Sequence, residues 1–394
     1  MLRHLKKFTI YGSVIASSFN DDNLKNAVNE WITDSTGAAL KYGPISAWDV
    51  SKVTNLGYMF YYRQTFDEPI GGWDVSRVTS MHRTFDKASA FNQDIGDWDV
   101  SKVTTMDSTF QGAAAFNQPI GDWDVSRVTT LSETFMYASD FNATIGGWDV
   151  SRVTDMYSTF REAFDFDAPL GDWDVSEVTQ MDEAFRNAWA FNQAIGAWDT
   201  SKVDDMIRLF SEAEAFNADI GGWDVSSVTR TYGTFFYATD FNAPIGCWDV
   251  SKVTDMYGMF QQARAFNAPI GAWDVSPETK KTYMFSGAST FNQCLSWHSD
   301  FSEGCEPTTA TCEPTTAPTA MPTAAPTADP SAMPTAAPTT APTAMPTAAP
   351  TVDPTASFIE ITSMGTESRC VANVECELLW VYRGDPGACE NVII

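Results

Sequence analysis

The stretch WDVSRVTTLSETFMYASDFNATIG, residues 123–146, is one copy of a pattern that returns every 25 residues along most of the chain. Tryptophan keeps this spacing from Trp48 to Trp273. Phenylalanine keeps it from Phe60 to Phe285 and from Phe66 to Phe291, and isoleucine or leucine keeps it from Ile70 to Leu295. A fixed period of about 20–50 residues indicates a solenoid, in which each unit buries its apolar side against its neighbours.

The first half of each repeat has the spacing of a helix. Val128, Leu131, Phe135 and Ala138 follow one another at intervals that place them on one helical stripe, and Thr129 is a suitable N-cap. In the second half, proline often precedes the isoleucine column and cannot donate to a β-ladder, so any strand is limited to Ile-Gly-x-Trp. We therefore predict the α/β class: a leucine-rich-repeat-like solenoid of ten 25-residue strand-helix repeats.

Changes of composition divide the chain into four regions. Residues 1–44 form an N-terminal region with a helical cap, and residues 45–306 form the solenoid with its C-terminal cap. Proline recurs every fourth residue through most of 307–356, which predicts a disordered Pro/Thr/Ala-rich linker in extended polyproline II. Residues 357–394 read as a short β segment that contains cysteines, either a truncated Ig-like domain or a segment stapled by disulfides.

The N-terminal region has two parts. Arg3, Lys6 and Lys7 precede a short apolar segment, which is interpreted either as a signal peptide or as the first strand of the cap. The next apolar residues have helical spacing and predict a helix that seals the first repeat: Leu24, Ala27, Val28 and Trp31.

Charge and cysteine usage limit the partners and the compartment. The net charge of −27 argues against nucleic acid or an anionic bilayer as a partner. No apolar run reaches the roughly 18 residues of a membrane span. The cysteines gather outside the repeats, which is typical of an oxidising compartment, whereas Cys247 stands alone within a repeat and is expected as a thiol.

An aspartate follows every repeat tryptophan, as Asp124 follows Trp123. A ladder of carboxylates could hold Ca²⁺, which takes oxygen ligands. The favoured alternative is structural, because Asp in Asp-Val-Ser can close an Asx turn on the backbone. Calcium is retained as a possible partner.

An asparagine or aspartate column follows the second phenylalanine. It is expected to satisfy loop amides inside the turn. Asn142 also begins the glycosylation sequon Asn-Ala-Thr. A column that points inward cannot be glycosylated, so the two interpretations exclude each other.

The candidate ligand face lies between the isoleucine and tryptophan columns. Small or acidic residues stand there, and on the concave side of the solenoid they would form a shallow negative groove for a basic or cation-bridged ligand. The acidic members of this column are Asp97, Asp122 and Asp172.

No residues are arranged for catalysis. The three histidines occupy unrelated positions, and His82 is expected on the solvated side of a repeat helix. No zinc spacing, no phosphate-binding glycine loop and no Ser/His/Asp set recurs. We therefore predict a protein that is not an enzyme and has no cofactor.

The recurring WDVSxVTxMxxxF, followed by AxxFNxxIGxW, resembles the BspA-like leucine-rich-repeat surface proteins, in the branch of mycoplasma-type repeats of unknown function. The resemblance covers roughly residues 20 to 297. It implies a surface-exposed or secreted solenoid without assigned catalytic residues. The chain departs from the pattern at Thr231, Glu278 and Lys281, and the last two make the final repeat polar, as befits a terminal cap.

These features predict a cell-surface or secreted module that binds or adheres to an extracellular protein or glycan. One alternative is a module associated with cell-wall polysaccharide enzymes, for which Asp122 and Asp172 would be needed. Another is a calcium-stabilised structural array. An ice-binding array is less favoured, because only one threonine recurs in each repeat and it is assigned to capping.

Overall fold

The computed structural model describes residues 17–299. The signal-peptide alternative in the first sixteen residues lies outside the described residues. The same holds for residues 300–306 of the repeat region, for the linker at 307–356 and for the β segment at 357–394.

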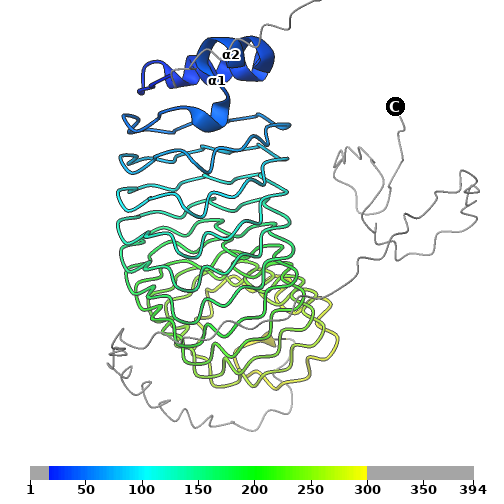
Figure 1. The fold of residues 1–394 in the computed structure, drawn as a ribbon. Helices are drawn as coiled ribbons and strands as arrows, with labels where there is room; N and C mark the ends of the chain where they lie inside the picture. Colours follow the sequence, from blue (N-terminus) through cyan, green and yellow to red (C-terminus); the bar gives the residue numbers. More distant parts are fainter. Residues whose placement is uncertain (1–16, 300–394) are drawn as a thin grey trace, which may run out of the picture. The chain divides into compact units, whose positions relative to one another are not determined.

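Two α-helices and a short 3₁₀ helix stand at the N-terminal end of the repeats (Figure 1). Helix α1 spans Leu24–Thr33, α2 spans Ser35–Tyr42, and η1 spans Ile45–Ala47. The predicted helix is confirmed as α1, whose buried residues are the four of the apolar pattern: Leu24, Ala27, Val28 and Trp31. Helix α2 was not predicted, and it begins where the Asp34 side chain accepts the Gly37 amide at 2.9 Å.

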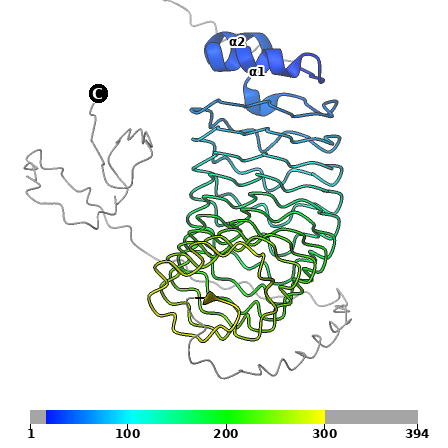
Figure 2. The same cartoon turned by 180° about the vertical axis from the view of Figure 1, so that it is seen from behind.

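From Trp48 the chain winds into coils of 25 residues that lie on one another (Figures 1 and 2). Successive coils meet in isolated parallel β-bridges at one position per coil, as between Asp155 and Gln180. Between Trp48 and Trp297 the described chain contains no helix and no strand longer than one bridge. The predicted strand-helix composition of each repeat is therefore wrong.

The predicted helix is replaced by a turning segment that bonds to the next coil. Glu133 and Tyr137 have φ values of 55° and 61°, which an α-helix excludes. The amide of Thr134 donates to Leu131 three residues back at 3.0 Å, whereas the amide of Phe135 donates to Thr159 in the next coil at 2.9 Å. Alternate amides thus find partners within the coil and between coils.

Thr129 is not an N-cap. Its amide and its hydroxyl both donate to the carbonyl oxygen of Thr104 in the preceding coil, at 3.1 and 3.3 Å. The threonine column therefore joins coils.

The predicted Ile-Gly-x-Trp strand is a turn. The Trp148 amide donates to the Ile145 carbonyl oxygen three residues back at 3.1 Å. Glycine is needed at its second position because the next coil comes so close. A Cβ atom on Gly121 would lie 2.4 Å from the carbonyl oxygen of Thr144. The glycine column thus permits close approach of neighbouring backbones at a bend.

The interior is filled by columns of aromatic rings. All ten repeat tryptophans are buried, and the Trp123 and Trp148 rings are parallel with centroids 6.5 Å apart. Phe135 stacks on Phe141 of its own coil at 3.9 Å and on Phe160 of the next at 5.7 Å. The prediction that these columns form the core is confirmed.

Candidate functional site

Comparison of the ten coils with one another separates conserved positions from variable ones. The tryptophan, phenylalanine, isoleucine and asparagine columns change little, because they fill the core or bond neighbouring coils. Five positions change freely, and we call the surface that they form the variable face. In the first coil its residues are Gly57, Tyr58, Tyr61, Tyr62 and Gln64, and the equivalents follow at steps of 25 residues.

Two positions of the variable face have positive φ in all ten coils. Sixteen of the residues there are not glycine, and they include bulky ones such as Tyr58, Tyr137 and Tyr237, with φ between 55° and 61°. The left-handed conformation costs a residue with a Cβ atom roughly 1–2 kcal/mol. Glycine avoids this cost, but it occupies these two positions in only a few coils, as at Gly112 and Gly233. Backbone strain of this kind gathers at functional sites.

The variable face also holds the exposed aromatic side chains. Eight large hydrophobic side chains of the described chain are exposed, and seven of them lie on this face. The eighth is Leu40 of α2. The seven are Tyr58, Tyr62, Tyr137, Tyr157, Trp189, Tyr237 and Tyr283.

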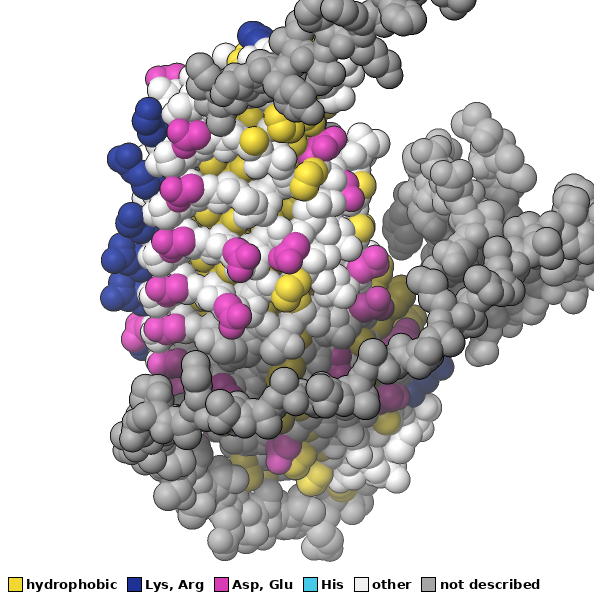
Figure 3. Space-filling view, in the orientation of Figure 1, with side chains coloured by type: hydrophobic (Ala, Val, Ile, Leu, Met, Phe, Trp, Pro, Cys, Tyr) yellow, Lys and Arg dark blue, Asp and Glu magenta, His cyan; other side chains and the backbone are white. Residues whose placement is uncertain are grey.

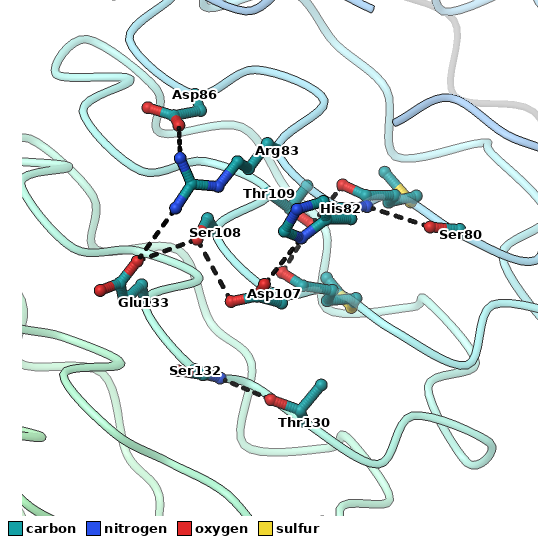
Figure 4. A network of polar contacts seen from close by, with 12 residues as sticks. Ser80, His82, Arg83, Asp86, Asp107, Ser108, Thr109, Thr130, Ser132 and Glu133 are labelled. Carbon is teal, nitrogen blue, oxygen red and sulfur yellow. Dashed lines mark hydrogen bonds and ion pairs between the residues drawn. The ribbon is translucent and has the colours of Figure 1, made fainter. Parts of the chain in front are cut away.

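A polar network joins coils at the N-terminal end of the variable face (Figure 4). The Nδ1 atom of His82 lies 2.7 Å from a carboxylate oxygen of Asp107, and its Nε2 atom lies 3.0 Å from the Tyr58 hydroxyl. The hydroxyl of Ser108 donates to Glu133 at 3.0 Å. The expectation of a solvated His82 is therefore wrong, because it is held between groups of the two neighbouring coils.

Arg83 lies between two carboxylates in the same network. Its guanidinium is 3.4 Å from Asp86 and 3.9 Å from Glu133. Asp86 is only 1% exposed, and burial raises the pKa of its carboxyl group although the Arg83 charge acts to lower it. The arginine thus partly offsets a buried charge.

A second ionic cluster lies further along the variable face. Glu183 is contacted by three arginines from successive coils: Arg161 at 2.8 Å, Arg186 at 3.2 Å and Arg208 at 3.5 Å. The guanidinium of Arg208 also lies over the Tyr232 ring, 5.2 Å from its centroid. Arg186 and Arg208 line a hollow of about 110 Å³.

The predicted ligand column occupies the turn before each tryptophan. Asp97, Asp122 and Asp172 are exposed there, each following the turn glycine. The turn is not the strand that was expected for them. It lies eight residues along the coil from the last position of the variable face, as Gly147 does from Ser139.

The aspartates that follow tryptophan close turns, as predicted. Asp124 accepts the amide of Ser126 at 3.1 Å, and with this one nine of the ten coils make the bond. In five of them a serine hydroxyl also holds the pKa of the aspartate below its usual value, as Ser101 does for Asp99. Within residues 17–299, no three acidic, histidine or cysteine side chains converge at metal-binding distance.

Figure 3 shows acidic side chains in a line along one edge of the coils, beside a line of lysines and arginines. The basic residues three positions beyond the turn aspartates, such as Lys102 and Arg127, are exposed.

The asparagine column bonds each coil to the next. Asn142 accepts the Asp167 amide through Oδ1 at 2.9 Å, and its own amide donates to Asn117 at 2.9 Å. The structural role is confirmed, but the expected inward direction is wrong, because Asn142 is exposed. Since the ladder uses Oδ1 and a glycan is attached through Nδ2, the two interpretations do not exclude each other.

Two cysteines within residues 17–299, Cys247 and Cys294, are disulfide-bonded. The expectation of a thiol at Cys247 is therefore wrong.

The geometry defines a repeat protein: coils of constant length, bonded to their neighbours by the same atoms in turn. The chain belongs to the family described as Mycoplasma protein of unknown function, DUF285, whose model matches residues 22–135, 118–220 and 179–299. None of the curated proteins matches the chain. In the described part of the chain, neither helix is long and apolar enough to cross a bilayer.

Proposed function

We propose that the protein is a secreted or cell-surface binding module and that the variable face is its binding surface. The observation that carries the proposal is the gathering of exposed aromatic side chains at strained positions. In Tyr137 and Tyr237 the strain and the exposure fall on the same residue. The left-handed backbone also serves the stack, since the Tyr137 amide donates to the Arg161 carbonyl oxygen of the next coil at 2.8 Å. The exposed aromatic rings that it carries suit recognition.

The composition of the face supports recognition as well. Tyrosine and serine are the two commonest residue types on the face, and both are enriched in antibody binding loops, where tyrosine supplies large contact area at low entropic cost. The conserved columns hold this varied surface on a rigid frame. Such a surface can be changed residue by residue without disturbing the core.

We also propose the finer assignments made from the sequence. These are a solenoid related to BspA-like leucine-rich-repeat surface proteins, an extracellular location and a role in adhesion without catalysis. The disulfide-bonded Cys247 and Cys294 support an oxidising compartment. Extracellular proteins and glycans are the proposed partners.

The test is to probe arrays of extracellular proteins and glycans with the full chain. Tyr137→Gly and Tyr237→Gly remove exposed rings while leaving a residue that the backbone accepts, as Gly112 does at the equivalent position. We expect binding to weaken at least about tenfold without a fall in melting temperature.

The matched control is a triple variant of the other candidate surface, Asp97→Asn, Asp122→Asn and Asp172→Asn. It should bind like the parent. Loss of binding in this control but not in the tyrosine variants would move the site to the acidic column. A chain that binds nothing on the arrays would contradict the binding role.

A further inference from the structure

A cleft lies where the helical cap meets the first coil. Its volume is about 380 Å³, within the range of about 300–1,000 Å³ that is usual for small-molecule sites. Trp31 and Ser35 line it from the helical cap, and Tyr62, Arg63, Phe66 and Glu68 line it from the first coil. The cleft thus combines aromatic surfaces with groups that donate and accept hydrogen bonds.

The first coil carries charged residues in this cleft where later coils do not. Arg63 stands where the nine following coils have alanine. Glu68 stands where those coils have only glutamine or alanine. The Arg63 guanidinium donates to the Asn29 side chain of α1 at 2.7 Å, so it also fastens the helix to the coil. Stacking of coils does not require either charge, because nine coils stack without them.

The indole N–H of Trp31, a residue that lines the cleft, has no hydrogen-bond partner in the described structure. Trp31 is 9% exposed, and its Nε1 atom is buried. The neighbouring Trp48 differs, since its Nε1 donates to the Gly43 carbonyl oxygen at 3.1 Å. A buried donor left unpaired costs about 1–3 kcal/mol, so a group that accepts this bond would be favoured in the cleft.

The charges in the cleft restrict the ligand class. Glu68 disfavours an anion and Arg63 disfavours a cation, so the two together suit a neutral group that both donates and accepts. The exposed aromatic ring of Tyr62 suits an apolar ring face. A sugar has this combination of hydroxyl groups and a C–H face. We propose that the cleft between α1, α2 and the first coil binds a neutral saccharide.

The experiment measures the melting temperature of the full chain with and without each probe, and the affinity for the probe by titration calorimetry. The probes are neutral saccharides: glucose, galactose, mannose, N-acetylglucosamine, cellobiose, laminaribiose and chitobiose. At least one of them should raise the melting temperature. Glu68→Gln places in the first coil a residue that natural coils carry at Gln93 and Gln118, so it should fold normally. The variant should lower the affinity for that sugar at least about tenfold.

Trp31→Phe is the second variant, because it keeps a ring and removes only the N–H among the polar groups. It should abolish the sugar-dependent rise in melting temperature. Gln93→Ala, at the position of Glu68 in the next coil, is the matched control and should bind like the parent. A panel in which no sugar raises the melting temperature overturns the proposal, as does equal binding by the parent and Glu68→Gln.

The cleft shares Tyr62 and Gln64 with the variable face, but Trp31 and Glu68, whose variants test the inference, lie outside that face. Tyr137→Gly and Tyr237→Gly should leave saccharide binding unchanged, and Glu68→Gln should leave array binding through the variable face unchanged. Failure of one proposal is therefore distinguishable from failure of the other.

Discussion

The indole Nε1 of Trp123 donates a hydrogen bond of 3.1 Å to the carbonyl oxygen of Ile95 in the preceding coil. Each repeat tryptophan from Trp73 to Trp273 makes the same bond one coil back. The indole therefore does two things that phenylalanine cannot do together: it fills the core and bonds to a carbonyl oxygen of the preceding coil.

Trp123→Phe should lower the free energy of unfolding by about 0.5–1.5 kcal/mol, because the Ile95 carbonyl oxygen loses the indole N–H and keeps only the Trp98 amide. Trp123→Ala should cost about 3–5 kcal/mol, since it also leaves a cavity. Urea denaturation followed by circular dichroism measures both. Trp297→Phe is the control at the partly buried end of the stack, and it should cost less than Trp123→Phe. Equal costs at the two positions would contradict the role of the buried bond.

Asn142→Ala should lower the free energy of unfolding by about 0.5–1.5 kcal/mol, because the Asp167 amide loses its acceptor. Asn142→Asp should have a smaller effect, since a carboxylate accepts the same bond. Asp167 itself does so for the Asn192 amide at 2.9 Å. Thermal unfolding compares the two variants. If alanine and aspartate had the same effect, the ladder bond would contribute nothing.

Stability should fall in acid because of the turn aspartates. The Ser101 hydroxyl, 2.6 Å from Asp99, holds the pKa of that carboxyl below its usual value of 3.8. The stability that it contributes is present above pH 3.8 and is lost as the pH falls through the lower pKa of the folded state. Ser101→Ala should raise the midpoint of acid unfolding. Ser126→Ala is the control, because the bond that Asp124 accepts comes from the backbone amide of residue 126, which alanine keeps.

Asp182 should act in the opposite direction. Burial raises the pKa of its carboxyl group to about 6, although the Ile207 amide bonds to it. The folded state therefore holds the proton more tightly, and stability should fall as the pH rises from 3.8 to about 6. Asp182→Asn should remove this fall and be more stable than the parent at pH 7. Urea unfolding at several pH values would show it, and an unchanged pH profile would contradict it.

The interior could be predicted from sequence, and the path of the backbone could not. Trp123 and Phe135 were expected inside because their columns keep one period, and they are buried. The spacing of Leu131, Phe135 and Ala138 fits a helix and a coil that turns back on itself equally well. The choice depends on whether an amide finds its carbonyl four residues back or in the next coil. No local pattern contains that information.

The candidate site shows the same limit. Asp97, Asp122 and Asp172 were chosen for their charge on an expected strand that is not formed. The signal that finds the variable face is the contrast between copies. Tyr137 and its equivalents differ from coil to coil, whereas neighbouring Ala138 recurs as alanine in eight other coils. This contrast is visible in the sequence, but it becomes a surface only when the coils are stacked.

The sequence by itself determined the length of each coil and the residues that fill it, because burial requires apolar groups at a fixed period in every copy. The tertiary structure alone decided which groups meet across coils. His82 lies beside Asp107 and Tyr58 only because residues 24 or 25 apart become neighbours in space. Long-range backbone hydrogen bonds set that register, and their partners lie one full coil apart in the sequence.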